Sequence, residues 1–159
     1  MPIKDIDHLS DHSSVWIFGI TPALGNPDHV LRLVDTFHRS WEAHGTPVTS
    51  GREIREGRFL VVAAEKSSEK SGCSIDRMFG LIREIERNFE VAMLDANRVY
   101  FRDAAGVITD VARADFGQVG APDTVVFDTT VTTLGEVRNG SWEKPASQSW
   151  HSALLRQSA

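Results

Sequence analysis

The sequence predicts an α+β fold: a single antiparallel or mixed sheet, two main helices on one face of it, and a C-terminal extension. Short apolar runs rich in β-branched and aromatic residues recur along the chain, which is typical of strands. Two longer segments, 28–41 and 75–89, carry apolar residues at spacings of three and four, which is typical of amphipathic helices. Because these helices fall between strand pairs, the order resembles a ferredoxin-like, split βαβ unit.

The first strand is predicted at VWIFGI (15–20), which is followed by the breaker-rich TPALGNP. Asn26 can then cap a helix that has Pro27 at its first position. Gly45 is predicted to supply the left-handed stop of this helix. The residues that share its apolar face are Val30, Val34, Phe37 and Trp41.

Two strands follow, and VTSGREI (48–54) is polar enough to be an edge whereas RFLVVAAE (58–65) is apolar enough to be central. The second helix presents one apolar stripe, made of Ile75, Met78, Phe79, Ile82, Ile85 and Phe89. VAMLD (91–95) is predicted as a fourth strand. RVYFRD (98–103) and GVITDV (106–111) are predicted to pair as a hairpin.

The pattern weakens after residue 111, although TVVFDTTV (124–131) predicts a strand and Thr133 with Glu136 forms a T-x-x-E capping box. A terminal helix is predicted from about Ser149. No biased linker divides the chain, so 1–159 is expected to be a single domain. Its expected parts are a polar lead (1–14), an α+β core (15–111) and a C-terminal extension packed on that core (112–159).

Composition argues against several classes of function. The net charge of −5 gives no basic face for nucleic acid, and no stretch approaches the 18 apolar residues of a membrane span. One cysteine allows no intrachain disulfide, and the first residues do not resemble a signal peptide. We therefore expect a cytoplasmic protein that binds neither nucleic acid nor membrane, with no cofactor.

Several stretches together resemble an uncharacterised family of short bacterial proteins whose members often carry the label "ABC transporter ATPase" in genome sequences. They are VWIF (15–18), WEAHGTP (41–47), SGCSID (71–76), DTVVF (124–128) and SWHS (149–152). The resemblance implies no established activity and no catalytic residues. A P-loop ATPase requires G-x-x-x-x-G-K-[ST], and the sequence contains no such string. ATP hydrolysis is therefore not expected.

The predicted entrance of the second helix is the place where the sequence suggests a site. Its residues are Ser71, Gly72, Cys73 and Ser74. Free amides at a helix N-terminus favour an anion and lower the pKa of a thiol. A reactive Cys73 would need a base such as His44 or His151, and Asp76 lies in the same first turn. The favoured alternative is that Ser71 and Ser74 cap the helix while Cys73 packs as a small hydrophobe.

Other candidates are weaker. His8 and His12 lie four residues apart, but they lack a third ligand, so no metal site is expected. If Asp76 met Asp95, the pKa of one carboxyl group would rise. The C-terminal Trp142 and Trp150 would form either an intramolecular clasp, which we favour, or an interface.

For function, the sequence favours a non-catalytic binding or assembly module, which could be homo-oligomeric through an exposed sheet edge. The alternative is a small-molecule or anion-binding protein, or an enzyme, that uses residues 71–76 and Cys73.

Overall fold

A computed structural model describes residues 6–65 and 71–156 of the chain. Within these residues the protein is α+β, with three antiparallel sheets and five α-helices. The first sheet has the strand order β1-β5-β4, and every pairing in it is antiparallel. These strands are β1 (Ser14–Gly19), β4 (Ser50–Arg55) and β5 (Phe59–Ala64). All six residues of β5 are buried, so the predicted central strand and edge strand are both confirmed.

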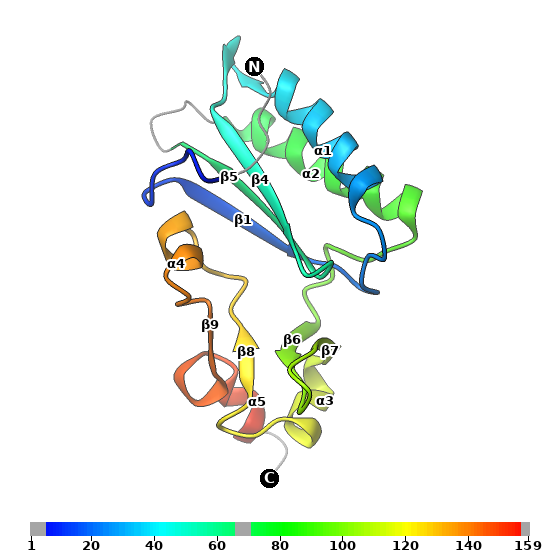
Figure 1. Ribbon diagram of the computed structural model, residues 1–159, viewed down its shortest axis with the longest axis vertical. Helices are drawn as coiled ribbons and strands as arrows, with labels where there is room; N and C mark the ends of the chain where they lie inside the picture. The colour runs from blue at the N-terminus through cyan, green and yellow to red at the C-terminus, as the bar shows by residue number, and fades with distance from the viewer. Residues whose placement is uncertain (1–5, 66–70, 157–159) are drawn as a thin grey trace.

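Two helices, α1 (Asp28–Ser40) and α2 (Gly72–Phe89), cover one face of this sheet (Figure 1). Their apolar stripes meet the even-numbered residues of β5, because alternate side chains of a strand point to the same face. The prediction that both main helices lie on one side is therefore confirmed. The residues at this contact include Val30, Val34, Met78, Ile82, Leu60 and Val62.

The prediction of a single sheet is wrong, and the ferredoxin-like arrangement is not confirmed. A second sheet of order β7-β6-β8-β9 packs against the other face of the first. The physical reason lies in β5, whose odd-numbered residues Phe59, Val61 and Ala63 are as apolar as its even ones and need a second cover. The strands are β6 (Arg98–Arg102), β7 (Ile108–Ala112), β8 (Val125–Phe127) and β9 (Glu143–Pro145).

Two further details differ from the sequence predictions. Helix α1 ends at Ser40, and Gly45 instead forms the turn of a small hairpin between β2 (Glu42–Ala43) and β3 (Thr46–Pro47). Residues 91–95 form no strand, because only Ala92 pairs, in an isolated bridge with Thr21. The run is too short for a ladder once the side chain of Glu86 bonds the amides that follow Ala92.

The C-terminal third of the chain packs against both sheets. Helices α3 (Arg113–Val119) and α5 (Ser152–Arg156) cover the outer face of the second sheet, with the 3₁₀ turn η1 (Ala146–Gln148) beside them. Helix α4 (Leu134–Arg138) lies beside the start of β1 (Figure 1), where Thr133 bridges to Ser14. The predicted capping box of Thr133 and Glu136 is confirmed.

The first described residues also take part in the core, since Ile6 and Leu9 are buried in the same apolar cluster as Phe59 of the first sheet and Phe127 of the second. No helix among the described residues is long and apolar enough to span a membrane.

Candidate functional site

At the helix entrance suggested by the sequence, Ser71 and Ser74 cap the helix, as the favoured alternative predicted. The Oγ of Ser71 accepts a hydrogen bond from the amide of Ser74 at 3.1 Å, and the Oγ of Ser74 accepts one from the amide of Ser71 at 2.9 Å. This reciprocal capping box satisfies two of the amides that an anion would use. Cys73 is exposed, so the interpretation that it packs as a small hydrophobe is wrong.

The structure does not bring His151 to Cys73. His151 is 1% exposed and precedes α5, whereas Cys73 lies in the first turn of α2, and Figure 1 places these helices at opposite ends of the molecule. His44 is exposed in the β2–β3 turn, and Asp76 is exposed on α2.

Asp76 and Asp95 do not meet either, since Asp76 lies near the start of the 18-residue α2 and Asp95 follows its other end. His8 and His12 are both exposed. Within residues 6–65 and 71–156, no group of three histidine, cysteine or acidic side chains could hold a metal ion.

A cavity of about 240 Å³ lies instead where the two sheets meet, and we call it the inter-sheet cavity. Its walls come from β1, from β6, from the loop after α2, from the start of α3 and from two segments of the C-terminal third. The polar and charged side chains that line it are Asp95, Arg98, Tyr100, Arg113, Thr129 and Thr130.

One wall is the contact between Gly19 of β1 and Tyr100 of β6. A Cβ atom at Gly19 would lie 2.2 Å from the Tyr100 ring, so only glycine allows the ring to lie against β1. The Tyr100 hydroxyl is 2.8 Å from Thr21 Oγ1. Burial raises the pKa of Tyr100, so the phenol stays neutral and can donate or accept a hydrogen bond.

Arg98 is held in the cavity wall by Asp110 of β7. Its Nε and Nη2 atoms donate to Asp110 Oδ2 at 2.8 and 2.5 Å, while Arg58 bonds the other carboxylate oxygen. Burial alone would raise the pKa of Asp110, but hydrogen bonds and the charges of Arg58 and Arg98 outweigh it and lower that pKa. The orientation of Arg98 is thus fixed by a carboxylate whose side chain is 8% exposed.

Trp150 forms another wall, between a cation and an imidazole. The guanidinium carbon of Arg113 lies 4.7 Å from the centre of the indole, and the His151 ring stacks on Trp150 with centroids 3.9 Å apart. The indole Nε1 of Trp150 is buried and has no hydrogen-bond partner among the described residues. A buried donor without an acceptor is costly, so an acceptor supplied by a ligand or by a water molecule would stabilise this N–H.

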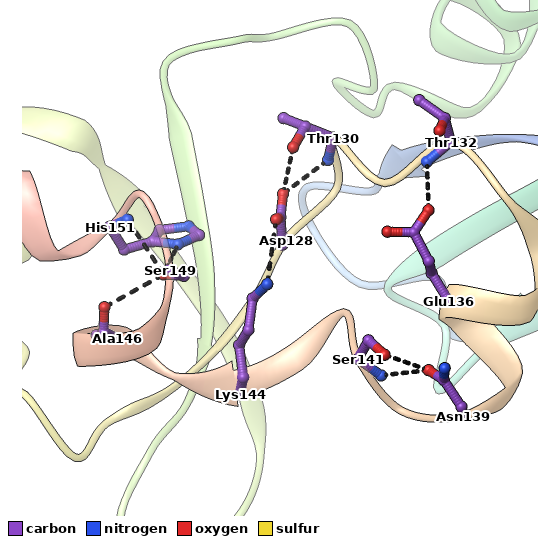
Figure 2. Close-up of polar contacts among 10 residues, drawn as sticks. All are labelled: Asp128, Thr130, Thr132, Glu136, Asn139, Ser141, Lys144, Ala146, Ser149 and His151. Carbon is purple, nitrogen blue, oxygen red and sulfur yellow. Dashed lines mark hydrogen bonds and ion pairs between the residues drawn. The ribbon is translucent and has the colours of Figure 1, made fainter.

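His151 is itself fixed by the turn before α5. Its Nδ1 lies 2.7 Å from Ser149 Oγ, which also accepts a hydrogen bond from the His151 amide (Figure 2). Burial lowers the pKa of His151 to about 4, so the ring is neutral at physiological pH. These contacts give His151 the role of a support for Trp150.

The loop carrying Thr129 and Thr130 is ordered by Asp128, which follows β8. Asp128 Oδ1 accepts hydrogen bonds from the amide and hydroxyl of Thr130, and Lys144 Nζ lies 3.5 Å from Oδ2 (Figure 2). Burial would raise the pKa of Asp128, yet the bonds from Thr130 and the charge of Lys144 hold it below its ordinary value.

The loop after α2 is ordered in the same way. Glu86 Oε2 accepts from the amides of Met93 and Leu94 at 2.8 and 3.1 Å. Asp95 Oδ1 accepts from the amide of Asn97 at 2.9 Å. The inter-sheet cavity is therefore preformed, because side-chain hydrogen bonds fix each of its loops.

Comparisons of the chain with protein-family models, with curated proteins and with solved structures find no match. Sequence reasoning singled out Trp150 and Asp95 without joining them, and it missed Arg98 and Arg113. The signal that joins the two arginines is the strand register, in which Arg98 pairs with Ala112, the residue before Arg113.

Proposed function

We propose that the protein is a non-catalytic binding protein for a small anionic ligand, held in the inter-sheet cavity. The observation that carries this proposal is that two guanidinium groups and one indole N–H, from different elements, belong to the lining of one cavity. Arg98 of β6, Arg113 of α3 and the unpartnered Nε1–H of Trp150 belong to residues that line the same cavity. Guanidinium groups bind carboxylates and phosphates through paired hydrogen bonds, and an indole N–H adds a third donor.

The two arginines differ in how many of their N–H donors are already used within the protein. Arg98 is committed through two nitrogens to Asp110, so it supplies a fixed positive charge. Arg113 is exposed and contacts the Trp150 ring, which leaves its fork of N–H donors available to an incoming anion. The volume lies below the roughly 300–1,000 Å³ of sites for drug-sized ligands, which favours a small ligand.

Binding without chemistry is favoured by the kind of side chain present. Among the described residues that line the inter-sheet cavity there is no histidine, cysteine or lysine. Tyr100, whose pKa is raised by burial, does not ionise near neutral pH. A general acid or base works best when its pKa is close to the operating pH, so this lining suits recognition better than catalysis.

The test is a ¹H–¹⁵N NMR titration of the protein with inorganic phosphate and, separately, with acetate at constant ionic strength. We expect the amides of Gly19, Thr129 and Thr130 to shift with one of the two anions. Arg113→Gln and Trp150→Phe should each weaken that binding about tenfold or more, since each removes one donor to a charged group. Arg83→Gln removes the same charge from an exposed position on α2 and should leave binding unchanged.

Shifts that are equal in Arg113→Gln and in wild type would contradict the proposal. So would anion-dependent shifts confined to residues 71–76, which would place binding at the entrance of α2.

A further inference from the structure

One acidic side chain lines the inter-sheet cavity beside the two arginines. Asp95 belongs to the loop after α2 and precedes Arg98 by three residues. A site built for an anion alone would gain nothing from a carboxylate in its wall, because like charges repel. The presence of Asp95 therefore points to a ligand that also carries a positive charge.

Asp95 is oriented by the backbone and keeps capacity for a ligand. Its Oδ1 accepts from the amide of Asn97, which fixes the side chain in a tight turn. A carboxylate has two oxygens and about four lone-pair sites, so Oδ2 remains to accept from an ammonium group. Such a charge-assisted hydrogen bond is about twice as strong as a neutral one.

Another part of the lining is apolar. Ile17 of β1 lines the cavity together with Met93 and Leu94 of the same loop as Asp95. These side chains would cover a hydrocarbon group of the ligand and remove it from water. The lining thus combines a guanidinium region, a separate carboxylate and an apolar wall.

We propose that the ligand is a free α-amino acid bound as the zwitterion; this inference rests on the proposed function and specifies its ligand class. The α-carboxylate binds Arg113 and Trp150 Nε1–H beside Arg98, and the α-ammonium group binds Asp95. The ligand side chain packs on Ile17, Met93 and Leu94. The preformed loops mean that binding does not have to order the site.

The experiment compares an amino acid with analogues that lack one charge. The standard L-amino acids are first screened by the ¹H–¹⁵N titration, with L-leucine as the reference probe because the apolar wall is aliphatic. Each amino acid that binds is then compared by calorimetry with its des-amino acid, which for leucine is 4-methylpentanoate. The amine without a carboxylate is the third probe, which for leucine is 3-methylbutylamine.

We expect the amino acid to bind at least about tenfold more tightly than either analogue, because each analogue lacks one charge-assisted contact. Asp95→Asn keeps an acceptor for the Asn97 amide but removes the charge. It should abolish the preference for the amino acid over the des-amino acid while leaving binding of the des-amino acid unchanged or stronger. Asp76→Asn removes an exposed carboxylate from α2 and should retain the full preference.

The outcomes separate the two proposals. If 4-methylpentanoate binds as tightly as leucine and shifts the cavity amides, the amino-acid proposal is wrong while anion binding stands. If Asp95→Asn keeps the preference, the ammonium group does not bind Asp95 and the proposal also fails. If no amino acid, acetate or phosphate shifts the amides that line the cavity, both proposals are overturned.

Discussion

Two histidine side chains, His38 and His151, are buried in different parts of the molecule. His38 of α1 is 3% exposed and its Nδ1 lies 2.5 Å from Ser50 Oγ, while His151 contacts Ser149 in the same way. Burial lowers the pKa of each imidazole from the ordinary 6.5 to about 4. Both rings are therefore neutral in the folded protein at a pH where they would be half-charged in the unfolded chain.

These pKa values predict the pH dependence of stability. As the pH falls through 6.5, the unfolded chain takes up protons at His38 and His151, whereas the folded protein does not do so until about pH 4. Since the unfolded state binds more protons in this window, the free energy of unfolding should fall as the pH decreases from 6.5 to about 4. Urea denaturation at several pH values measures this slope.

An exposed histidine provides the control for that measurement. His29→Gln, on the outer face of α1, should keep the wild-type slope. A free energy of unfolding that stays constant from pH 7 to pH 4.5 would show that the two buried rings do not have depressed pKa values.

At the scale of elements, the contact between β1 and β6 links the sheets and shapes the inter-sheet cavity. It depends on Gly19, because any side chain at this position would overlap the Tyr100 ring. Tyr100 in turn contacts Thr21, which follows β1, and the guanidinium of Arg58, which precedes β5. One glycine thus sets the spacing between two sheets at the edge of the cavity.

Gly19→Ala should destabilise the protein by about 1–3 kcal/mol, the range found when a packed contact is overfilled. The same variant should weaken ligand binding, because a displaced Tyr100 changes the cavity wall. Chemical denaturation and the phosphate and amino-acid titrations measure both effects. Gly25→Ala is the matched control, since a Cβ there meets nothing within 4 Å.

The double variant Gly19→Ala/Tyr100→Leu tests the cause, because removing the ring relieves the overlap. Its loss of stability should be smaller than the sum of the two single losses. An additive result would mean that the two residues are not coupled through this contact.

The sequence predicted the elements better than their assembly. The amphipathic stripe of α2, the serine cap at its start and the capping box of Thr133 could be predicted because they depend on neighbours within four residues. The second sheet was not, because β8 has three residues and pairs with β6 through Phe101 and Val126, which are far apart in the chain. The site shares this limit, since Arg98, Arg113 and Trp150 meet only through tertiary packing.

At the scale of the whole molecule, the two sheets share one apolar layer. The Phe59 ring of β5 contacts Phe127 of β8 and Trp142, which precedes β9. The ring centroids are 4.9 and 5.0 Å from that of Phe59. Trp142 is 2% exposed, so it acts within the chain as the predicted clasp. Because both sheets contribute side chains to this layer, separating them would expose the apolar side chains of each sheet to water.

We therefore predict that the chain unfolds as a single cooperative unit. Trp142→Ala should lower the free energy of unfolding by about 3–5 kcal/mol, the usual loss for a buried aromatic side chain. Far-UV circular dichroism and the fluorescence of the remaining tryptophans should give the same midpoint in denaturant. Val119→Ala, at a valine that is 56% exposed, is the control and should change stability by less than about 0.5 kcal/mol. Two separate transitions in wild type would contradict the prediction.

The order of the elements along the chain has a consequence for synthesis on the ribosome. Strands β1, β4 and β5 and both long helices are complete once Phe89 has been made, whereas the strands that cover Phe59, Val61 and Ala63 come later. Because synthesis proceeds at about 5–20 residues per second, this apolar face of the sheet stays uncovered on the nascent chain for several seconds. Exposed apolar surface of this kind favours association with other unfolded chains, and the exposure of Phe59 ends only after Trp142 has been made and can pack against it.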